Sequence, residues 1–480
     1  MGKKMFDWLN KLVTAGSKEK TAPAAAGDAP PKRVSAGDAP PKQDAAASSF
    51  PVSQLGSAET PAPVSRMILL DRAGQIIGYE FVARSGMLGV RGADPRQQQS
   101  NDQLLVKTIL GMGADRIAQF RQIWLTVGEM ALNVALLEGM PAAATMVLVR
   151  LAGQGPANEE VLQQARALKA QGFRFGLAGF AERENCLAWL PLVDVVALDI
   201  GGYAPDELVS TLALLRQKQP TIKVLARRID SYEEYEYCLT RGFDNFSGKF
   251  LTHRESWPPQ PPLTPDRIRL CDLLNRLRSG AELSEISDGL KLSPELSYRF
   301  LRYINSAGMG ASSHIGSLEQ GVLYLGREKL YRWLTLLLFS GAEGQATDGA
   351  LLEQALVRGR MLELLASGKL THVQCEELFV VGVFSLLDVL LRMPLEIAVR
   401  PLQLPAAVAQ ALLEGNGPYA PYLKLAKVSE DSETELGAGE TMSSVASLAA
   451  PLGLSIEQVN RHHLDAVSWA QQLQSGQAPA

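Results

Sequence analysis

Cysteine is scarce in this sequence and is poorly placed for cross-links or metal binding. The chain has 4 cysteines among 480 residues, and no two of them form a Cys-x-x-Cys pair. A disulfide framework and a cysteine-ligated zinc site are therefore not indicated. Long apolar runs of membrane-spanning length are also missing, and the N-terminus lacks the apolar core and small-residue cleavage site of a secretory signal. We therefore expect a cytoplasmic protein.

A strong charge of one sign is missing as well. The formal net charge is −4 and the isoelectric point is near 5.9. Broad binding to nucleic acid or to an anionic membrane needs a strongly basic face, so we expect nucleic acid not to be a partner. What the chain does have is 46% hydrophobic residues, enough to bury at least two domain-sized cores.

The first 64 residues are rich in Ala, Pro, Lys and Ser, and they repeat one heptapeptide. The sequence AGDAPPK occupies Ala26–Lys32 and Ala36–Lys42. Such a composition cannot bury a core. We therefore expect a disordered tail over residues 1–64.

A short apolar pattern precedes these repeats. At helical spacing it places on one face Met5, Trp8, Leu9 and Leu12. An amphipathic helix of this kind could dock weakly onto a membrane surface or a partner. A frayed end that does neither is the alternative, because isolated short helices are marginal in water; the pattern leaves both open.

Beyond the tail, short apolar strands alternate with helix-compatible segments. A hairpin is predicted where Arg66–Leu70 and Gln75–Phe81 flank the turn Asp71–Gly74. The further predicted strands are Ile123–Val127, Thr145–Leu151, Phe173–Leu177, Val193–Leu198, Ile222–Ala226 and Asn245–Ser247. This alternation predicts a mainly parallel sheet that closes into a barrel over residues 65–257.

The rest of the chain has a helical pattern. A proline-rich linker is predicted at 258–264. After it, Thr264 and Ser293 are each followed by proline at the first helical position, and Ser317 with Gln320 forms the pattern of a capping box. We expect an all-helical domain over residues 265–473.

Several segments of this helical part, in order, resemble an HDOD domain. They are Leu292–Pro294, Leu301–Ala307, Ile315–Gly321, Leu325–Arg327 and Leu330–Leu334. Residues 66–250 resemble an EAL domain of the cyclic di-GMP phosphodiesterases, and the order of the two parts is similar to that of the bacterial EAL–HDOD signalling proteins. The resemblance implies a modified TIM-like (β/α) barrel followed by a helical domain. EAL enzymes hold divalent cations at the carboxyl ends of the barrel strands, and these cations activate the attacking water.

The resemblance matches three functional positions of an EAL domain. Glu80 in the segment Gly78–Arg84 matches the signature glutamate, Arg84 the arginine that follows it, and Asp199 an aspartate of the active site. We expect these residues to serve as salt-bridge or hydrogen-bond groups at the barrel mouth.

The other functional positions carry residues that are poor ligands for magnesium, which prefers oxygen donors. The resemblance places these positions at Met67, Gly128, Val149, Ala178, Gly179, Ala197, Arg227 and Ser247. Two remaining carboxylates cannot assemble a two-cation site, and the positive charge of Arg227 repels cations. We therefore expect no catalytic residue, no metal and no cofactor.

The helical part also lacks the residues of its hydrolytic relatives. HD-type phosphohydrolases bind metals through a His-Asp dyad, and the resemblance places that dyad at Ser385 and Leu386. The pair His462-His463 is predicted to lie at a solvated helix end, because adjacent residues on a helix point in different directions.

Leu283–Arg302 also fits the pattern of a helix-turn-helix, with the second helix opening near Ser293. Its expected exposed residues, Glu295, Ser297, Arg299 and Arg302, are a mixed set rather than a basic one. An ordinary helical pair inside the bundle is the favoured interpretation.

These observations predict a catalytically inactive signal-transduction regulator, a scaffold that binds other signalling proteins in cyclic di-GMP-linked signalling. Three alternatives remain open: a non-hydrolysing receptor for cyclic di-GMP, a phosphodiesterase with an unorthodox metal site, and a DNA-binding regulator that uses the helical pair near Ser293.

Overall fold

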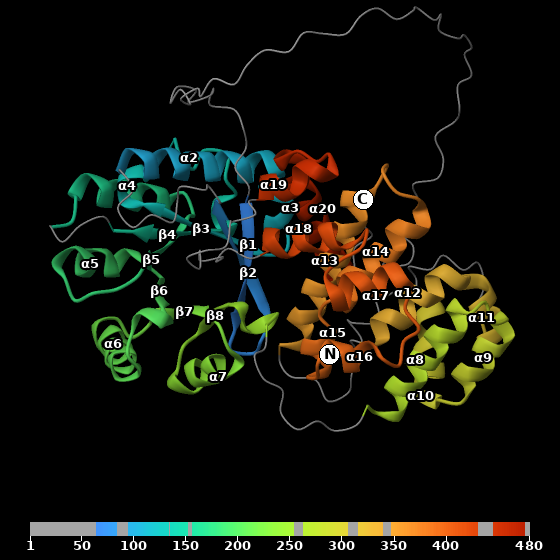
Figure 1. Cartoon of the computed structure of the whole chain (residues 1–480). Helices are drawn as coiled ribbons and strands as arrows, with labels where there is room; N and C mark the ends of the chain where they lie inside the picture. The colour runs from blue at the N-terminus through green and yellow to red at the C-terminus, as the bar shows by residue number, and fades with distance from the viewer. Residues whose placement is uncertain are drawn as a thin grey trace, which may run out of the picture.

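The computed structural model describes residues 64–83, 95–133, 135–151, 156–253, 263–305, 315–338, 347–430 and 445–475 (Figure 1). Several predictions fall outside these ranges. They concern the N-terminal tail with Met5, Trp8, Leu9 and Leu12, the proline-rich linker, and Arg84.

Eight strands form a closed barrel in chain order. Their bounds are β1 Val64–Asp71, β2 Ile76–Ala83, β3 Gln122–Gly128, β4 Thr145–Arg150, β5 Arg174–Ala178, β6 Val195–Asp199, β7 Lys223–Ile229 and β8 Asn245–Gly248. Strand β1 runs antiparallel to both neighbours, β2 and β8, whereas the pairs from β2 to β8 are parallel. The predicted barrel with a leading hairpin is confirmed.

The hairpin turn is held by the side chain of its first residue. Asp71 Oδ1 accepts hydrogen bonds from the backbone N–H groups of Ala73 and Gln75, both at 2.9 Å. Gly74 has a φ of 69°, a left-handed conformation that glycine adopts without steric cost. The turn therefore forms where the sequence predicts it.

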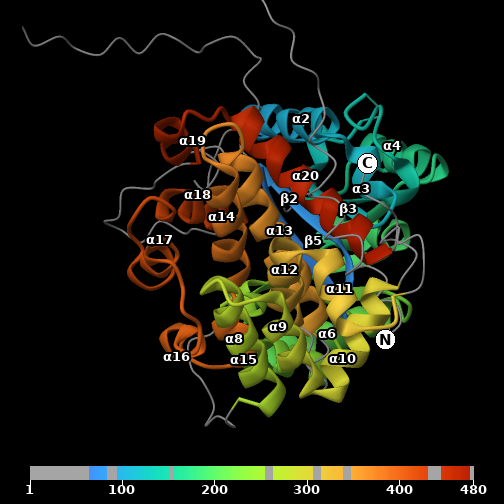
Figure 2. The same cartoon turned by 90° about the vertical axis from the view of Figure 1, so that its right-hand side faces the viewer.

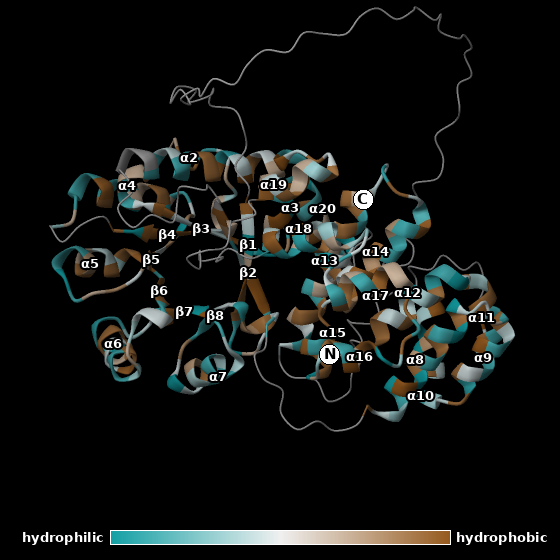
Figure 3. Cartoon of the chain, in the orientation of Figure 1, coloured by the Kyte–Doolittle hydropathy of each residue, from teal (hydrophilic) through white to brown (hydrophobic). Residues whose placement is uncertain are grey.

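Helices between the strands cover the outside of the barrel. They are α2 Pro95–Met112, α3 Ala114–Ala118, α4 Glu159–Ala170, α5 Glu184–Trp189, α6 Pro205–Lys218 and α7 Tyr232–Arg241. Figure 3 shows hydrophilic and hydrophobic residues side by side on outer helices such as α4 and α6. In α4, Asn158 caps the N-terminus and Leu162 and Leu168 are buried, the pattern of a helix with one face on a core.

Side chains alternate between the inside and the outside of the barrel. The inner cluster consists of Leu69, Trp124, Met146, Leu148, Val195, Ala197 and Leu225. Their strand neighbours, such as Val147 and Val196, belong to the larger outer cluster that extends into the helices. The inside is thus a packed core, and functional groups are confined to its ends.

The C-terminal part is helical, as predicted. Its helices are α8 Pro265–Arg278, α9 Leu283–Lys291, α10 Pro294–Ile304, α11 Leu318–Leu325, α12 Arg327–Leu337, α13 Asp348–Ala366, α14 His372–Phe384, α15 Leu387–Leu391, α16 Leu395–Val399, α17 Ala406–Ala409, α18 Ala420–Glu430, α19 Val445–Ala449 and α20 Ile456–Ser475. The predicted caps form: Thr264, Ser293 and Ser317 each accept a hydrogen bond from the backbone N–H three residues on. None of the helices in the described ranges is long and apolar enough to span a membrane.

Two facing glycines set the separation of α13 and α14. A Cβ on Gly382 would lie 2.5 Å from the Cα of Gly359, and a Cβ on Gly359 would lie 2.9 Å from the carbonyl oxygen of Phe379. Only residues without a side chain allow backbones this close. This close contact holds α13 in position against α14 next to Arg358, the neighbour of Gly359.

The helical part covers the side of the barrel that has no helix of its own. The hairpin leaves no helix between β1 and β2, and α13, α18 and α20 pack there (Figures 1 and 2). Across this boundary, Arg66 Nη2 donates to Gln354 Oε1 at 2.5 Å, and Glu353 accepts from Tyr79 Oη and from Arg121. The two parts therefore share one continuous buried core.

Two details of the helical part differ from the predictions. His463 lies inside α20 with 3% exposure, not at a solvated helix end, and burial together with Arg66 lowers its pKa to about 3. On α10, Ser297, Arg299 and Arg302 are half-buried rather than exposed. Arg299 forms an ion pair with Glu295, and Ser297 Oγ donates to the Leu290 carbonyl at 2.8 Å. Side chains engaged in this way favour an ordinary helical pair.

Candidate functional site

The candidate site is the mouth of the barrel at the carboxyl ends of the parallel strands, where barrel enzymes place their functional groups. Strand alternation puts Glu80 on β2, Thr126 on β3, Asp199 on β6 and Arg227 on β7 on the inner face. Their mutual contacts agree with this placement. Four side chains far apart in the sequence thus meet at one place.

Arg227 joins the two carboxylates at the mouth. Its Nη1 lies 3.1 Å from Glu80 Oε1, and its Nε lies 2.9 Å from Asp199 Oδ1. Thr126 Oγ1 donates to the same Glu80 oxygen at 2.9 Å. The Glu80 side chain is 3% exposed and that of Asp199 is 43% exposed, so Glu80 is the group that depends most on its cation.

A bulge in β7 follows Arg227 directly. The pairing of β7 with β8 shifts between Ala226 and Ile229, and Arg228 within the shift has a φ of 58°. Left-handed backbone is unfavourable for a residue with a side chain. Bulges of this kind redirect the side chains beside them, and here the bulge lies next to the arginine that faces the mouth.

Most of the positions that the resemblance marks as replaced lie on the inner face near the mouth. Met67 is paired in register with Glu80, and Ala178 with Ala197. Ser247 on β8 is fully buried, and its Oγ has no hydrogen-bond partner among the described residues. None of these side chains is a carboxylate, and only Ser247 offers an oxygen.

Two further replaced positions have distinctive backbone. Gly179, which follows β5, has a φ of 99°, and its N–H donates to the Ala197 carbonyl at 2.7 Å. The N–H of Gly128 at the end of β3 donates to Asp102 Oδ2 at 2.8 Å. Both glycines therefore contribute main-chain groups rather than side chains to this rim.

Val149, the position expected on β4, does not face the inside of the barrel. Val149 is buried in the outer cluster, whereas Met146 and Leu148 belong to the inner cluster. Alternation therefore puts Arg150, not Val149, on the inner face at the end of β4. A shift of one residue exchanges an apolar side chain for a second arginine at the mouth.

The pattern of residues did not reveal the partner of this second arginine. Asp102 on α2 is 6% exposed, and its Oδ1 lies 3.4 Å from Arg150 Nη2. Burial raises the pKa of this carboxyl, while the Gly128 N–H and Arg150 act to lower it. No motif marks Asp102, because it reaches the mouth from a helix rather than from a strand end.

Among the described residues, one group of three side chains could hold a metal ion. It consists of Glu328, His372 and Glu376, on α12 and α14 rather than at the barrel mouth. Exposed acidic groups of this kind are common without an ion.

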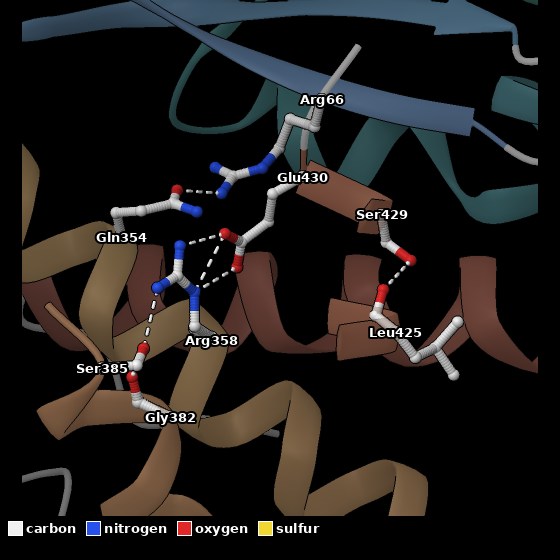
Figure 4. Close-up of polar contacts among 8 residues, drawn as sticks. All are labelled: Arg66, Gln354, Arg358, Gly382, Ser385, Leu425, Ser429 and Glu430. Carbon is white, nitrogen blue, oxygen red and sulfur yellow. Dashed lines mark hydrogen bonds and ion pairs between the residues drawn. The ribbon is translucent and has the colours of Figure 1, made fainter. Parts of the chain in front are cut away.

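Ser385 and Leu386 lie between α14 and α15. Ser385 Oγ accepts a hydrogen bond from Arg358 Nη1 and donates one to the Gly382 carbonyl, both at 2.7 Å (Figure 4). Leu386 is 1% exposed and belongs to the apolar core. This segment therefore anchors Arg358 at the end of α14.

Comparison with known proteins finds relatives along most of the chain, although no family model matches it. A cyclic di-GMP phosphodiesterase of Vibrio cholerae, CdgJ, is 23% identical over 412 residues, which is 85% of this chain and 92% of that protein. An uncharacterised protein of Bacillus subtilis, YuxH, is 24% identical over 388 residues, 78% of this chain and 93% of YuxH. The chain is thus similar over 85% of its length to a cyclic di-GMP phosphodiesterase.

Solved structures with similarity to the chain include two EAL proteins with cyclic di-GMP bound. A standalone EAL protein of Vibrio cholerae aligns with 40% of this chain and 91% of its own, at 15% identity and a TM-score of 0.32. The YkuI protein of Bacillus subtilis, which has an EAL domain and is bound to cyclic di-GMP and calcium, aligns with 49% of this chain and 73% of its own, at 14% identity and a TM-score of 0.32.

Proposed function

We propose that this chain is a catalytically inactive regulator of the EAL–HDOD type that acts in cyclic di-GMP-linked signalling by binding other signalling proteins. The observation that carries the proposal is the guanidinium of Arg227 between Glu80 and Asp199. The similarity to CdgJ over 85% of the chain supports the signalling system. The four cysteines are free, which supports a cytoplasmic setting.

The described residues of the mouth do not fit the pair of divalent cations that an EAL phosphodiesterase requires. Magnesium and manganese bind to oxygen ligands, mostly carboxylates. Here both carboxylates on the strands already bind a guanidinium, and Asp102 is paired with Arg150. A cation entering this site would displace an arginine and then face its charge.

The segment at the His-Asp dyad position of the helical part supports the same conclusion. Leu386 has no ligand atom, and the Ser385 hydroxyl is already engaged in two hydrogen bonds. The buried guanidinium of Arg358 lies beside it. A metal at this place would meet a fixed positive charge instead of an imidazole.

Retention of a complete barrel with a neutralised mouth favours recognition over chemistry. The barrel is closed, and a continuous core joins it to the helices. The ion pairs at the mouth neutralise its carboxylates. Partner binding through the surface of this assembly is therefore the function that the site supports best.

The test is incubation of the full chain with cyclic di-GMP and Mn²⁺ or Mg²⁺, followed by chromatography of the nucleotide. We expect the cyclic dinucleotide to be recovered intact at long incubation times. A linear product would refute the proposal if its formation were abolished by Glu80→Gln. A product that Glu80→Gln leaves unchanged would identify a contaminating phosphodiesterase, and the proposal would stand.

A further inference from the structure

A cavity of about 470 Å³ lies between the barrel and the helical part, beside the ion-paired mouth, with Met67 in its lining. Its walls come from β1, from the segment after β8, and from α13 and α18. Glu80, Asp199 and Arg227 are not among its lining residues. The volume lies within the range of sites that bind small molecules.

Arg66 on β1 contributes a buried cation to this cavity. It is 3% exposed, and its Nη2 donates to Gln354 (Figure 4). In the part of the chain that the structure describes, its Nε and Nη1 have no hydrogen-bond partner. The guanidinium carbon lies 4.6 Å from the centre of the Tyr79 ring. Within the described residues Arg66 forms no ion pair, and a buried cation without an anion is costly.

Lys427 on α18 adds a second cation from the opposite part of the molecule. It lines the cavity, stays accessible to solvent, and forms no ion pair with any described residue. Loss of surrounding water, and next the nearby Arg358, lower the pKa of its ammonium group. The nearby carboxylates of Asp388 and Glu430 act to raise this pKa. An anion placed between Arg66 and Lys427 would likewise favour the charged form of both.

The remaining charges of the cavity leave a positive surplus. Arg358 is neutralised by Glu430, whose carboxylate lies 2.6 Å from Arg358 Nη2 and also accepts from its Nε. Asp388 is the other lining carboxylate, and burial raises its pKa. With Arg358 paired to Glu430, the cations Arg66 and Lys427 face Asp388 as the one remaining lining carboxylate among the described residues, which leaves one positive charge in surplus.

We propose that this cavity binds a small phosphate ester, with Arg66 and Lys427 as the residues that hold its phosphate. Guanidinium and ammonium groups are the usual partners of phosphate oxygens. Arg66 supplies a positive charge from the wall of the barrel, and the accessible Lys427 supplies donors from the helical part. Because both parts contact the ligand, its binding stabilises their relative arrangement.

The experiment measures binding to the full-length chain by calorimetry and by the shift in melting temperature. The probes are inorganic pyrophosphate, guanosine monophosphate, cyclic di-GMP and, as a carboxylate without phosphate, citrate. Any compound that binds only the folded state raises the melting temperature. We expect at least one phosphate ester to bind and citrate to bind at least tenfold more weakly.

Lys427→Gln should weaken that binding at least tenfold. Lys424→Gln is the matched control, because Lys424 is an exposed lysine of the same helix that does not line the cavity. Arg66→Met should abolish binding while leaving the ligand-free chain at least as stable, since it removes a buried unpaired charge.

Three results would overturn the proposal. The first is that no phosphate-bearing probe binds. The second is that Lys427→Gln binds the phosphate-bearing probe as tightly as the unmodified chain and the control Lys424→Gln do. The third is that citrate binds as tightly as the phosphate esters, which would assign the cavity to carboxylates instead.

Discussion

The guanidinium of Arg227 lies 3.1 Å from the buried carboxylate of Glu80, across the inside of the barrel from β7 to β2. The carboxylate is thus neutralised by the chain itself. In the proposed function, this internal cation takes the electrostatic place that metal ions occupy in an EAL enzyme, but it cannot activate water. The predictions below follow from this contact and from the packing around it.

Arg227→Met should lower the free energy of unfolding by about 3 kcal/mol, the typical cost of leaving one partner of a buried ion pair alone. Glu80 loses its buried cation in this variant, while Asp199 is partly exposed and can be solvated. Urea denaturation followed by circular dichroism measures the change.

The control is the double variant Arg227→Met with Glu80→Gln, which removes both charges. We expect its loss of stability to be smaller than the sum of the two single losses by at least about 1 kcal/mol, because the residues are in direct contact. Strict additivity would show that the contact contributes nothing, and the account of the mouth would be wrong.

Placing single carboxylates at the end of β5 should not create activity. Ala178→Asp places a carboxylate on the inner face, yet the remaining ligand positions stay unsuitable, so we expect no cleavage of cyclic di-GMP with Mn²⁺. Gly179→Asp should in addition lower stability by about 1–3 kcal/mol, because its φ of 99° is strained for aspartate. Turnover by either variant, or equal melting temperatures for the two, would contradict these expectations.

The strands of the barrel could be predicted because their hydrophobic pattern is local. Each predicted strand overlaps an observed one, and the hairpin turn is specified by Asp71 and Gly74 at its ends. The hydrophobic pattern did not show which side chains of β4 face the inside of the barrel. A one-residue shift moves every side chain of a strand to the other face, and the apolar run Met146–Val149 gives no alternation to separate Val149 from Arg150.

Contacts between distant segments were also beyond prediction from the sequence. Asp102 reaches Arg150 from a helix 48 residues earlier, and His463 is buried because α20 packs against the barrel beside Arg66. No local pattern specifies either contact. By contrast, the order of the motifs in the EAL resemblance assigned Glu80, Asp199 and Arg227 to one site. The structure brings these three side chains into contact.

Gly382→Ala should destabilise the chain by about 1–3 kcal/mol, the range for overpacking of a tight core. The added methyl group would lie 2.5–2.8 Å from the backbone of α13. Gly349→Ala is the control on α13, because its added Cβ meets no atom within 4 Å. It should be neutral or stabilise the helix by up to about 1 kcal/mol. Equal effects of the two substitutions would refute the close packing of α13 and α14.

The buried His463 should make stability fall in mild acid. Its pKa is about 3 in the folded chain against an ordinary value of 6.5, so below pH 6.5 the unfolded state takes up a proton that the folded state refuses. The free energy of unfolding therefore decreases as the pH falls. Between pH 7 and pH 5 this residue should contribute a loss of about 2 kcal/mol.

The measurement compares urea midpoints of the unmodified chain and of His463→Gln at both pH values. Other titrating groups act in both proteins, so the difference isolates His463. An identical decrease in the two proteins would mean that His463 accepts a proton in the folded state, in conflict with its burial beside Arg66.

The most direct test of the central claim is the binding of Mn²⁺ to the full-length chain, measured by the electron paramagnetic resonance signal of the free ion. His372→Ala serves as the background, because it removes the surface cluster with Glu328 and Glu376. The account predicts no Mn²⁺ bound at the barrel mouth, and therefore the same signal before and after the further change Glu80→Gln. Bound Mn²⁺ that is released by Glu80→Gln would show that Arg227 gives way to a metal, and it would contradict the account.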